Sequence, residues 1–215
     1  MSRPTRRGTH VKSTDIGIRE AKPKDFAQVA EMHYPVWRQS WRGILADYLL
    51  DMLGTPKRWA TVVYPQDLNR PGWSMWIAES GGKTLGMTIF GPDAANPDHL
   101  QIDALYTAEE SHHLGIGGRL LNKAVRSNPS GDVILWCAEK NRRAREFYEK
   151  KNFQLDGRTF IWKPLPGVAV PHVGYRLYRS APNVELRQPS MTTRSPLARD
   201  TQTSISSPPT AVRPR

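Results

Sequence analysis

A glycine-rich turn ahead of an apolar helical segment places the strongest limit on how this chain can fold. Residues 112–121 read His-His-Leu-Gly-Ile-Gly-Gly-Arg-Leu-Leu, after a strand-like segment at 100–107 and at the start of a helix expected over 115–125. Glycines leave the first helical amides open, and those amides have no partner within the helix. With the helix dipole, the turn is typical of a phosphate or pyrophosphate site. Taken alone, a glycine bend needed for close packing explains it equally well.

Two other phosphate-binding motifs do not fit the chain. A dinucleotide-binding turn, Gly-x-Gly-x-x-Gly, would need its third glycine at the position of Leu120. Residues 82–84 read Gly-Lys-Thr, as at the end of a P-loop, but the first glycine of that motif is replaced by Ile77 and no helix follows. Residues 80–83 therefore indicate a hairpin turn between two strands.

The rest of the pattern alternates between strands and helices. Strands are expected at 15–20, 74–79, 84–90, 100–107, 133–138, 159–162 and 174–178. Helices are expected from 22–25 to an end or kink at Pro35, and at 41–53, 115–125 and 141–151. Strands and helices alternate in the second half of the folded unit, with hairpins before and after. This pattern predicts an α/β (α+β) fold in which a mixed sheet carries helices on both faces.

Only the middle of the 215-residue chain has the composition of a folded domain. Residues 181–215 are rich in Pro, Ser, Thr and Arg and have no aromatic residue, and residues 1–14 are similar. Such segments bury too little apolar surface to offset their ordering entropy, so we predict disordered tails around a folded unit at 15–180. Most of the net charge of +11 lies in these tails, which favours solvated basic tails over a nucleic-acid-binding surface.

Simpler features argue against several protein classes. No apolar run approaches the ~18–20 residues of a membrane span, and the basic start of the chain lacks the apolar stretch of a secretory signal. Cys137 is the single cysteine, so neither a disulfide framework nor a cysteine-based zinc site is expected, and the histidines lack metal-ligand spacing. We expect a cytoplasmic protein with no membrane partner and no metal.

A second motif, downstream, decides between the two explanations of the glycine turn. Residues 135–153 read Leu-Trp-Cys-Ala-Glu-Lys-Asn-Arg-Arg-Ala-Arg-Glu-Phe-Tyr-Glu-Lys-Lys-Asn-Phe. With the turn, this segment resembles the GNAT superfamily of acetyl-CoA-dependent N-acetyltransferases, whose signatures are Gln/Arg-x-x-Gly-x-Gly/Ala and Asn-x-x-Ala-x-x-Phe-Tyr-x-x-x-Gly-Phe. The chain departs from the signatures at His112 and Asn152, and has Glu109 where proline is usual.

The resemblance implies a mostly antiparallel central sheet whose strands splay around acetyl-CoA. The backbone at 105–107 would pair with the pantetheine arm, and the amides of the turn would hold the pyrophosphate. The implied cofactor-binding residues are Leu105, Tyr106, Thr107, His112, His113, Leu114, Gly115, Ile116, Gly117, Gly118, Asn141 and Tyr148. Asn141, between a strand and a helix, equally fits a helix N-cap. Since His112 replaces Gln or Arg, Arg119 is an alternative source of positive charge.

The resemblance also implies catalytic roles. Tyr148 matches the tyrosine that donates a proton to the departing thiolate, a task that suits a phenol, although it equally fits the buried stripe of a helix. The position of the family's glutamate base is Gln101, which cannot accept a proton productively. Asp103, on the same face of the strand, is the substitute candidate. Other candidate bases are His33, His99, Tyr106 and a chain of water molecules. An acyl-cysteine at Cys137 is disfavoured, because a lone buried cysteine usually acts as a small hydrophobe.

We therefore expect an N-acetyltransferase that moves an acetyl group from acetyl-CoA to a primary amine, a small molecule rather than a protein. The aromatic residues expected on the acceptor side, or alternatively in the core, are Tyr34, Trp37, Trp41 and Trp162, with the loop at 163–172 beside them. The rival hypothesis is a degenerate fold that binds nucleic acid or protein through its basic tails, favoured by His112 and Gln101. A longer acyl chain, a hydroxyl acceptor and a homodimer also stay open.

Overall fold

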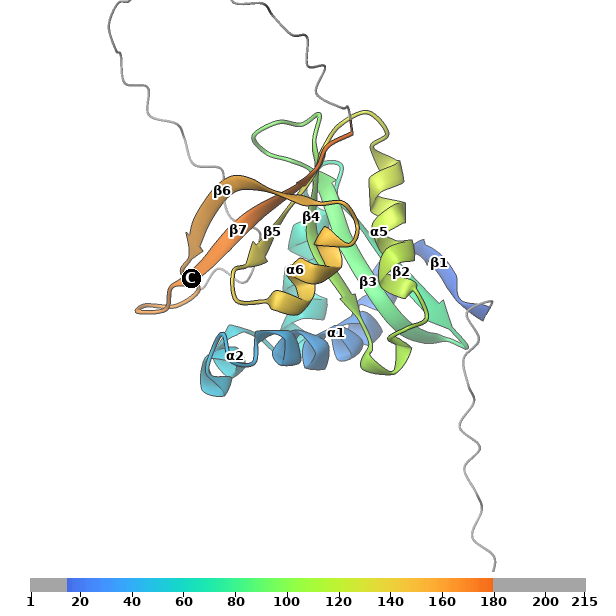
Figure 1. Ribbon diagram of the computed structural model, residues 1–215. Coiled ribbons are helices and arrows are strands. Elements are labelled where there is room, and N and C mark those ends of the chain that lie inside the picture. The colour runs from blue at the N-terminus through green and yellow to red at the C-terminus, as the bar shows by residue number, and fades with distance from the viewer. Residues whose placement is uncertain (1–14, 180–215) are drawn as a thin grey trace, which may run out of the picture.

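The computed structural model describes residues 15–179, and the tails expected at 1–14 and 181–215 lie outside them. The described residues form a seven-stranded sheet in the order β1-β2-β3-β4-β5-β7-β6 (Figure 1). Every neighbouring pair is antiparallel except β4 and β5, which are parallel. The mixed, mostly antiparallel sheet expected from the sequence is confirmed.

The strands are β1 (Gly17–Glu20), β2 (Ser74–Ser80), β3 (Lys83–Pro92), β4 (Leu100–Thr107), β5 (Val133–Ala138), β6 (Gln154–Trp162) and β7 (Val170–Leu177). The α-helices are α1 (Phe26–Trp41), α2 (Asp47–Leu53), α3 (Pro56–Arg58), α4 (Tyr64–Leu68), α5 (Ile116–Ser127) and α6 (Arg142–Glu149). The 3₁₀-helices are η2 (Pro23–Asp25) and η4 (Glu109–Ser111), and η3 (Trp59–Val63) is a π-helix.

Helices cover both faces of the sheet, as the alternating pattern predicts. Met87 and Ile89 of β3 belong to the apolar cluster beneath α1, whereas Leu85 and Phe90 belong to clusters on the side of α5. Alternation accounts for Phe90, because successive side chains of a strand point to opposite faces, whereas Leu85 lies at a register shift between β2 and β3 that interrupts the alternation. The helix α6 lies on the same side as α5, where Tyr148 packs with residues of β5 and β7.

Two helix boundaries differ from those expected. Pro35 does not end the first helix, since α1 continues through it to Trp41. Burial explains this, because α1 packs Phe26 before the proline and Trp37 after it into one core, and that burial outweighs the ~3 kcal/mol cost of a mid-helix proline. The helix expected at 41–53 begins only at Asp47, because the chain is extended at Arg42 and left-handed at Gly43.

The parallel pair at the centre of the sheet separates part-way along its length. The strands β4 and β5 pair only from Leu100–Val133 to Ile102–Leu135. Beyond that point, β4 pairs with β3 alone and β5 with β7 alone. The two strand ends therefore diverge and leave a gap in the middle of the sheet, which is the splay that the resemblance implies.

Candidate active site

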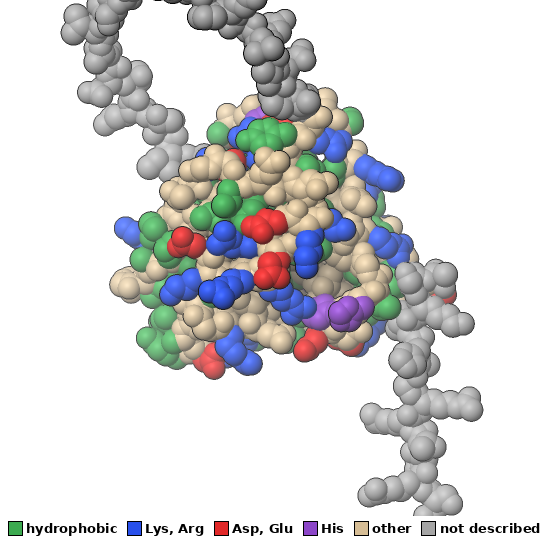
Figure 2. All heavy atoms as spheres, viewed as in Figure 1, with side chains coloured by type: hydrophobic (Ala, Val, Ile, Leu, Met, Phe, Trp, Pro, Cys, Tyr) green, Lys and Arg blue, Asp and Glu red, His purple; other side chains and the backbone are tan. Residues whose placement is uncertain are grey.

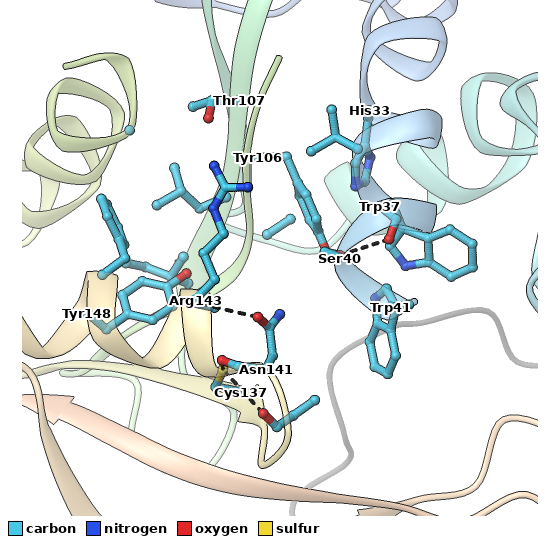
Figure 3. A pocket seen from close by; sticks show the side chains of 18 of the residues that line it. His33, Trp37, Ser40, Trp41, Tyr106, Thr107, Cys137, Asn141, Arg143 and Tyr148 are labelled. Carbon is cyan, nitrogen blue, oxygen red and sulfur yellow. Dashed lines mark hydrogen bonds between the residues drawn. The ribbon is translucent and has the colours of Figure 1, made fainter. Parts of the chain in front are cut away.

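A cavity of about 990 Å³ opens where β4 and β5 separate. Its lining comes from β4, the turn at 111–118 and α6, and also from α1, η3, α4 and β6. Figure 3 shows part of this lining. The expected site residues that line it are Asp103, Leu105, Tyr106, Thr107, His112, His113, Gly115, Ile116, Gly117, Gly118, Asn141 and Tyr148. Gln101 and Leu114 do not line it. The splay thus brings residues from distant parts of the sequence to one space.

The glycine turn leaves the first amides of α5 uncovered. Gly115 precedes the helix in the left-handed region, with φ at +72°, and a Cβ placed there would meet no atom within 4 Å. A Cβ at Gly117 would lie 3.4 Å from the Phe147 ring, so a larger side chain would fill the space beside α6. The hydroxyl of Ser111 donates to the Leu85 carbonyl over 3.1 Å and ties the turn to β3. The result is an open cradle for an anionic group at a helix N-terminus.

Positive charge at the turn comes from α6. The Nη2 atom of Arg143 lies 3.0 Å from Nδ1 and 3.1 Å from Nε2 of His112. Burial, and then the Arg143 charge, lower the pKa of His112 below its ordinary value, so the imidazole is neutral. Arg119, the alternative source of charge, donates over 2.8 Å to the Ile16 carbonyl at the β1 side. Lys and Arg side chains gather over α6 on this face of the molecule (Figure 2).

Asn141 and Tyr148 approach the cavity from opposite ends of α6. The side-chain oxygen of Asn141 accepts from the amide of Ala144 over 3.2 Å, so the N-cap explanation is confirmed. The ring of Tyr148 packs against Phe153 and Tyr175, and burial raises the pKa of its phenol above the ordinary value. Figure 3 shows Tyr148 and Asn141 on one side of the cavity, with Ser40 and Trp41 of α1 on the other. A phenol that keeps its proton at neutral pH can act as a proton donor here.

Asp103, the substitute candidate for the base, lines the cavity. Its side chain is 6% exposed, and its Oδ2 lies 3.6 Å from Nη2 of Arg70. The Gln101 amide donates to its Oδ1 over 3.5 Å, so Gln101 contacts the carboxylate without reaching the cavity. Burial raises the pKa of Asp103 above its ordinary value, while Arg70 and Gln101 oppose that change. A carboxylate whose pKa is raised by burial is better suited to accept a proton near neutral pH than an exposed carboxylate is.

Sequence reasoning missed Trp59 and Tyr64, which line the cavity from a segment with no expected structure. The π-helix η3 begins at Trp59 and α4 follows it at Tyr64. Both contact His33 of α1: the Trp59 and His33 rings are 4.4 Å apart, and the Tyr64 hydroxyl lies 2.9 Å from Nδ1 of His33. Gly54 makes room, since a Cβ there would lie 2.5 Å from Nε1 of Trp59. The only sequence signal for this segment was the five-residue spacing of Trp59 and Tyr64. This signal is weak because π-helices are rare.

The other expected residues divide between the cavity and the rest of the fold. Trp37, Trp41, Trp162 and His172 line the cavity, whereas Tyr34 and His99 do not. His99 lies beside Asn96 and Asp132 instead. Cys137 also lines the cavity, and burial raises its pKa to about 12, which keeps the thiol protonated. A protonated thiol is a poor nucleophile, in line with the expectation that no acyl-cysteine forms.

Comparison with known proteins gives the cavity its context. The sequence model described as the acetyltransferase (GNAT) family matches residues 28–153. The chain belongs to this family. A relative of this GNAT chain, described as the probable N-acetyltransferase Rv2775 of Mycobacterium tuberculosis, is 70% identical over 172 residues, which cover 80% of this chain and 99% of the relative. The expected enzyme class, an acyltransferase, is thereby confirmed.

Solved structures show the same fold at low identity. The PaiA N-acetyltransferase of Thermoplasma acidophilum, solved in complex with coenzyme A, is 17% identical with a TM-score of 0.59, and the match covers 74% of this chain and 97% of that one. The ribosomal-protein-S18-alanine N-acetyltransferase of Escherichia coli is 13% identical with a TM-score of 0.55, over 80% and 99% of the two chains. At these identities the likeness shows that this GNAT chain shares their fold.

Within residues 15–179, no group of three or more His, Cys, Asp or Glu side chains is placed to hold a metal ion. No helix in the same residues combines the length and apolar character that crossing a membrane requires.

Proposed function

We propose that this GNAT chain transfers the acetyl group of acetyl-CoA to a primary amine of a small molecule, by direct attack within a ternary complex. The observation that carries the proposal is that one cavity is lined by an open helix N-terminus, by Arg143 and by the buried carboxylate of Asp103. An anionic donor and an amine acceptor can thus meet in one enclosed space.

The residues at the turn fit the donor. The amides near Gly117 and the guanidinium of Arg143 provide hydrogen-bond donors and positive charge for a pyrophosphate. The edge of β4 from Leu105 to Thr107 has no neighbouring strand on the side of β5, so its backbone groups there are available to an extended pantetheine arm. Acetyl-CoA supplies the activated acetyl group as a thioester.

The proposed chemistry uses one base and one acid of this chain. The amine nitrogen forms a bond to the acetyl carbonyl carbon, and the carbon–sulfur bond breaks with its electron pair moving to sulfur. Asp103 accepts a proton from the amine, and Tyr148 donates a proton to the sulfur. Because the two groups line one cavity, both proton transfers can occur without a covalent enzyme intermediate.

A small acceptor is favoured over a protein because of what surrounds Asp103. The carboxylate is 6% exposed, and the acceptor side is lined by buried rings of α1 and η3. An amine must therefore leave water to reach Asp103, which a compact molecule can do with less disruption of the walls.

Coenzyme A release from acetyl-CoA, followed with a thiol reagent against a panel of primary amines, tests the proposal. We expect saturable turnover with at least one small amine, and a mass increase of that amine by one acetyl group. Tight binding of acetyl-CoA without acetylation of any amine in the panel would contradict the proposal and favour a degenerate binding module.

A further inference from the structure

The acceptor side of the cavity has a continuous aromatic wall. Each member lines the cavity, and successive ring centroids are 4.2, 4.4, 5.2, 6.3 and 5.0 Å apart in the order Tyr106, His33, Trp59, Trp37, Trp41 and Trp162. Three of the six lie four residues apart on α1 and so share one helix face. Figure 3 shows these three along α1, with Tyr106 opposite them. Such a wall offers flat apolar surface and electron-rich ring faces.

Two buried carboxylates at this wall share one arginine. Asp67 and Asp103 both line the cavity, with side chains 5% and 6% exposed. Each has a carboxylate oxygen 3.6 Å from the same atom, Nη2 of Arg70, which makes no hydrogen bond. With both carboxylates ionised, this group of three carries one negative charge in excess. A cation entering the cavity would therefore be attracted, and it would favour the ionised form of Asp103.

His33 provides a polar atom without a partner in the same wall. Its side chain is nine-tenths buried, its Nδ1 is hydrogen-bonded to Tyr64, and its Nε2 has no hydrogen-bond partner among the described residues. Burial lowers the pKa of His33 to about 3, so the ring is neutral. A buried polar atom left unpaired in a protein is costly, and a ligand hydrogen bond would remove that cost.

We propose that this end of the cavity selects a cationic aromatic amine, a protonated primary amine joined to an aromatic group by a short chain. The ring of such a ligand packs on the wall, its ammonium group lies near Asp67 and Asp103, and Nε2 of His33 is the remaining polar contact. The inference rests on the proposed function, because it names the substrate class of the same site.

The wall disfavours the main rival acceptors. An amino sugar would have to exchange many hydroxyl–water hydrogen bonds for contacts with indole rings. A simple aliphatic amine would satisfy the carboxylates but leave the ring faces without a partner. An aromatic amine uses both features, because cations and ring edges are each attracted to the faces of Trp and Tyr rings.

Calorimetric binding of three probes, with and without coenzyme A, tests the inference apart from turnover. The probes are 2-phenylethylamine, its neutral counterpart 2-phenylethanol, and the amino sugar kanamycin. We expect 2-phenylethylamine to bind about tenfold more tightly than 2-phenylethanol, and kanamycin to bind more weakly than either. Equal binding of the amine and the alcohol, or preference for kanamycin, would overturn the inference.

Variants separate charge from stacking. Asp67→Asn should reduce the preference for the amine over the alcohol about tenfold while leaving the alcohol unchanged. Trp59→Leu should weaken both aromatic probes. The matched control Trp76→Leu should weaken neither, because Trp76 does not line the cavity. If Trp59→Leu fails to fold, the probe preferences of the wild type and of Asp67→Asn still decide.

The outcome for acetyl transfer distinguishes the inference from the proposal beneath it. Acetylation of other amines but not of 2-phenylethylamine would overturn the substrate class and leave the acetyltransferase reaction intact. Binding of 2-phenylethylamine with the expected preferences, but no acetylation of any amine, would support the binding site and overturn the reaction.

Discussion

The guanidinium of Arg143 contacts the imidazole ring of His112. Its Nη2 atom lies 3.0 Å from Nδ1 and 3.1 Å from Nε2 of that ring. A guanidinium carries five N–H donors, so those that do not face the ring stay available. At the position where the family has Gln or Arg, this chain thus has a neutral imidazole beside a cation supplied by α6.

Replacing Arg143 should weaken the binding of coenzyme A. Arg143→Ala removes a charged donor from the turn, and we expect about a tenfold increase in Kd, with most of the difference lost at high salt. Calorimetric titration at two salt concentrations measures this. Arg119→Ala is the control, because Arg119 donates to the Ile16 carbonyl. Unchanged binding in Arg143→Ala together with weaker binding in Arg119→Ala would show that Arg119, and not Arg143, supplies the positive charge for coenzyme A.

Removing the phenol of Tyr148 should slow the reaction without unfolding the protein. Tyr148→Phe keeps the ring contacts with Phe153 and Tyr175, so the free energy of unfolding should change little. We expect kcat to fall about 10²-fold, the low end for loss of a general acid. The contrast is Tyr175→Phe, which loses the hydrogen bonds to Glu149 and Arg145 outside the cavity. It should lower the free energy of unfolding by about 1 kcal/mol and retain kcat.

Asp103 should determine the acidic limb of the pH–rate profile. A base works only when ionised, and burial raises the pKa of Asp103 in the free protein, so kcat/KM should rise with pH through a value above that of an ordinary carboxyl group. Asp103→Asn should lower kcat/KM and abolish this limb. Gln101→Glu is an informative companion, because the added carboxylate next to Asp103 should move the limb to higher pH. An unchanged limb in Asp103→Asn would show that another group takes the proton.

Two variants at Asn141 separate its cap from a contact with the cofactor. Asn141→Ala removes the hydrogen bond to the Ala144 amide, and we expect the free energy of unfolding to fall by about 1 kcal/mol. Asn141→Asp keeps a capping oxygen, so its stability in chemical denaturation should match the wild type. Weaker coenzyme A binding in both variants would show that Asn141 also contacts the cofactor. Unchanged coenzyme A binding in both variants would show that Asn141 serves only as the helix cap.

The parts of the fold that depend on local sequence patterns could be predicted from the sequence. The strands β4 and β5 occupy the residues expected for them. The sequence of β5 is a continuous apolar run, and β4 begins with apolar and polar residues in alternation, from Leu100 to Asp103. The glycine turn was located because glycine has few substitutes where the backbone is left-handed, as at Gly115. The splay of β4 and β5 was predicted from the family resemblance alone, because no local sequence pattern indicates where two strands stop pairing.

What could not be predicted depends on contacts between distant segments. The continuation of α1 past Pro35 reflects burial on both sides of it, which a local rule about proline does not contain. The π-helix that begins at Trp59 packs against His33 of α1, which lies in a distant part of the sequence. Likewise, the pairing of Asp67 and Asp103 through Arg70 joins α4 to β4, so only the folded chain shows it.

The most direct test is a calorimetric titration of the protein with acetyl-CoA, comparing the wild type with Gly117→Val. The added side chain would begin 3.4 Å from Phe147 and cover the helix amides, while Gly17→Val, whose Cβ would meet only the Glu79 carbonyl at 4.0 Å, is the matched control. The account predicts saturable micromolar binding in the wild type and in Gly17→Val, with at least tenfold weaker binding in Gly117→Val. No binding by the wild type, or equal binding by all three proteins, would contradict it.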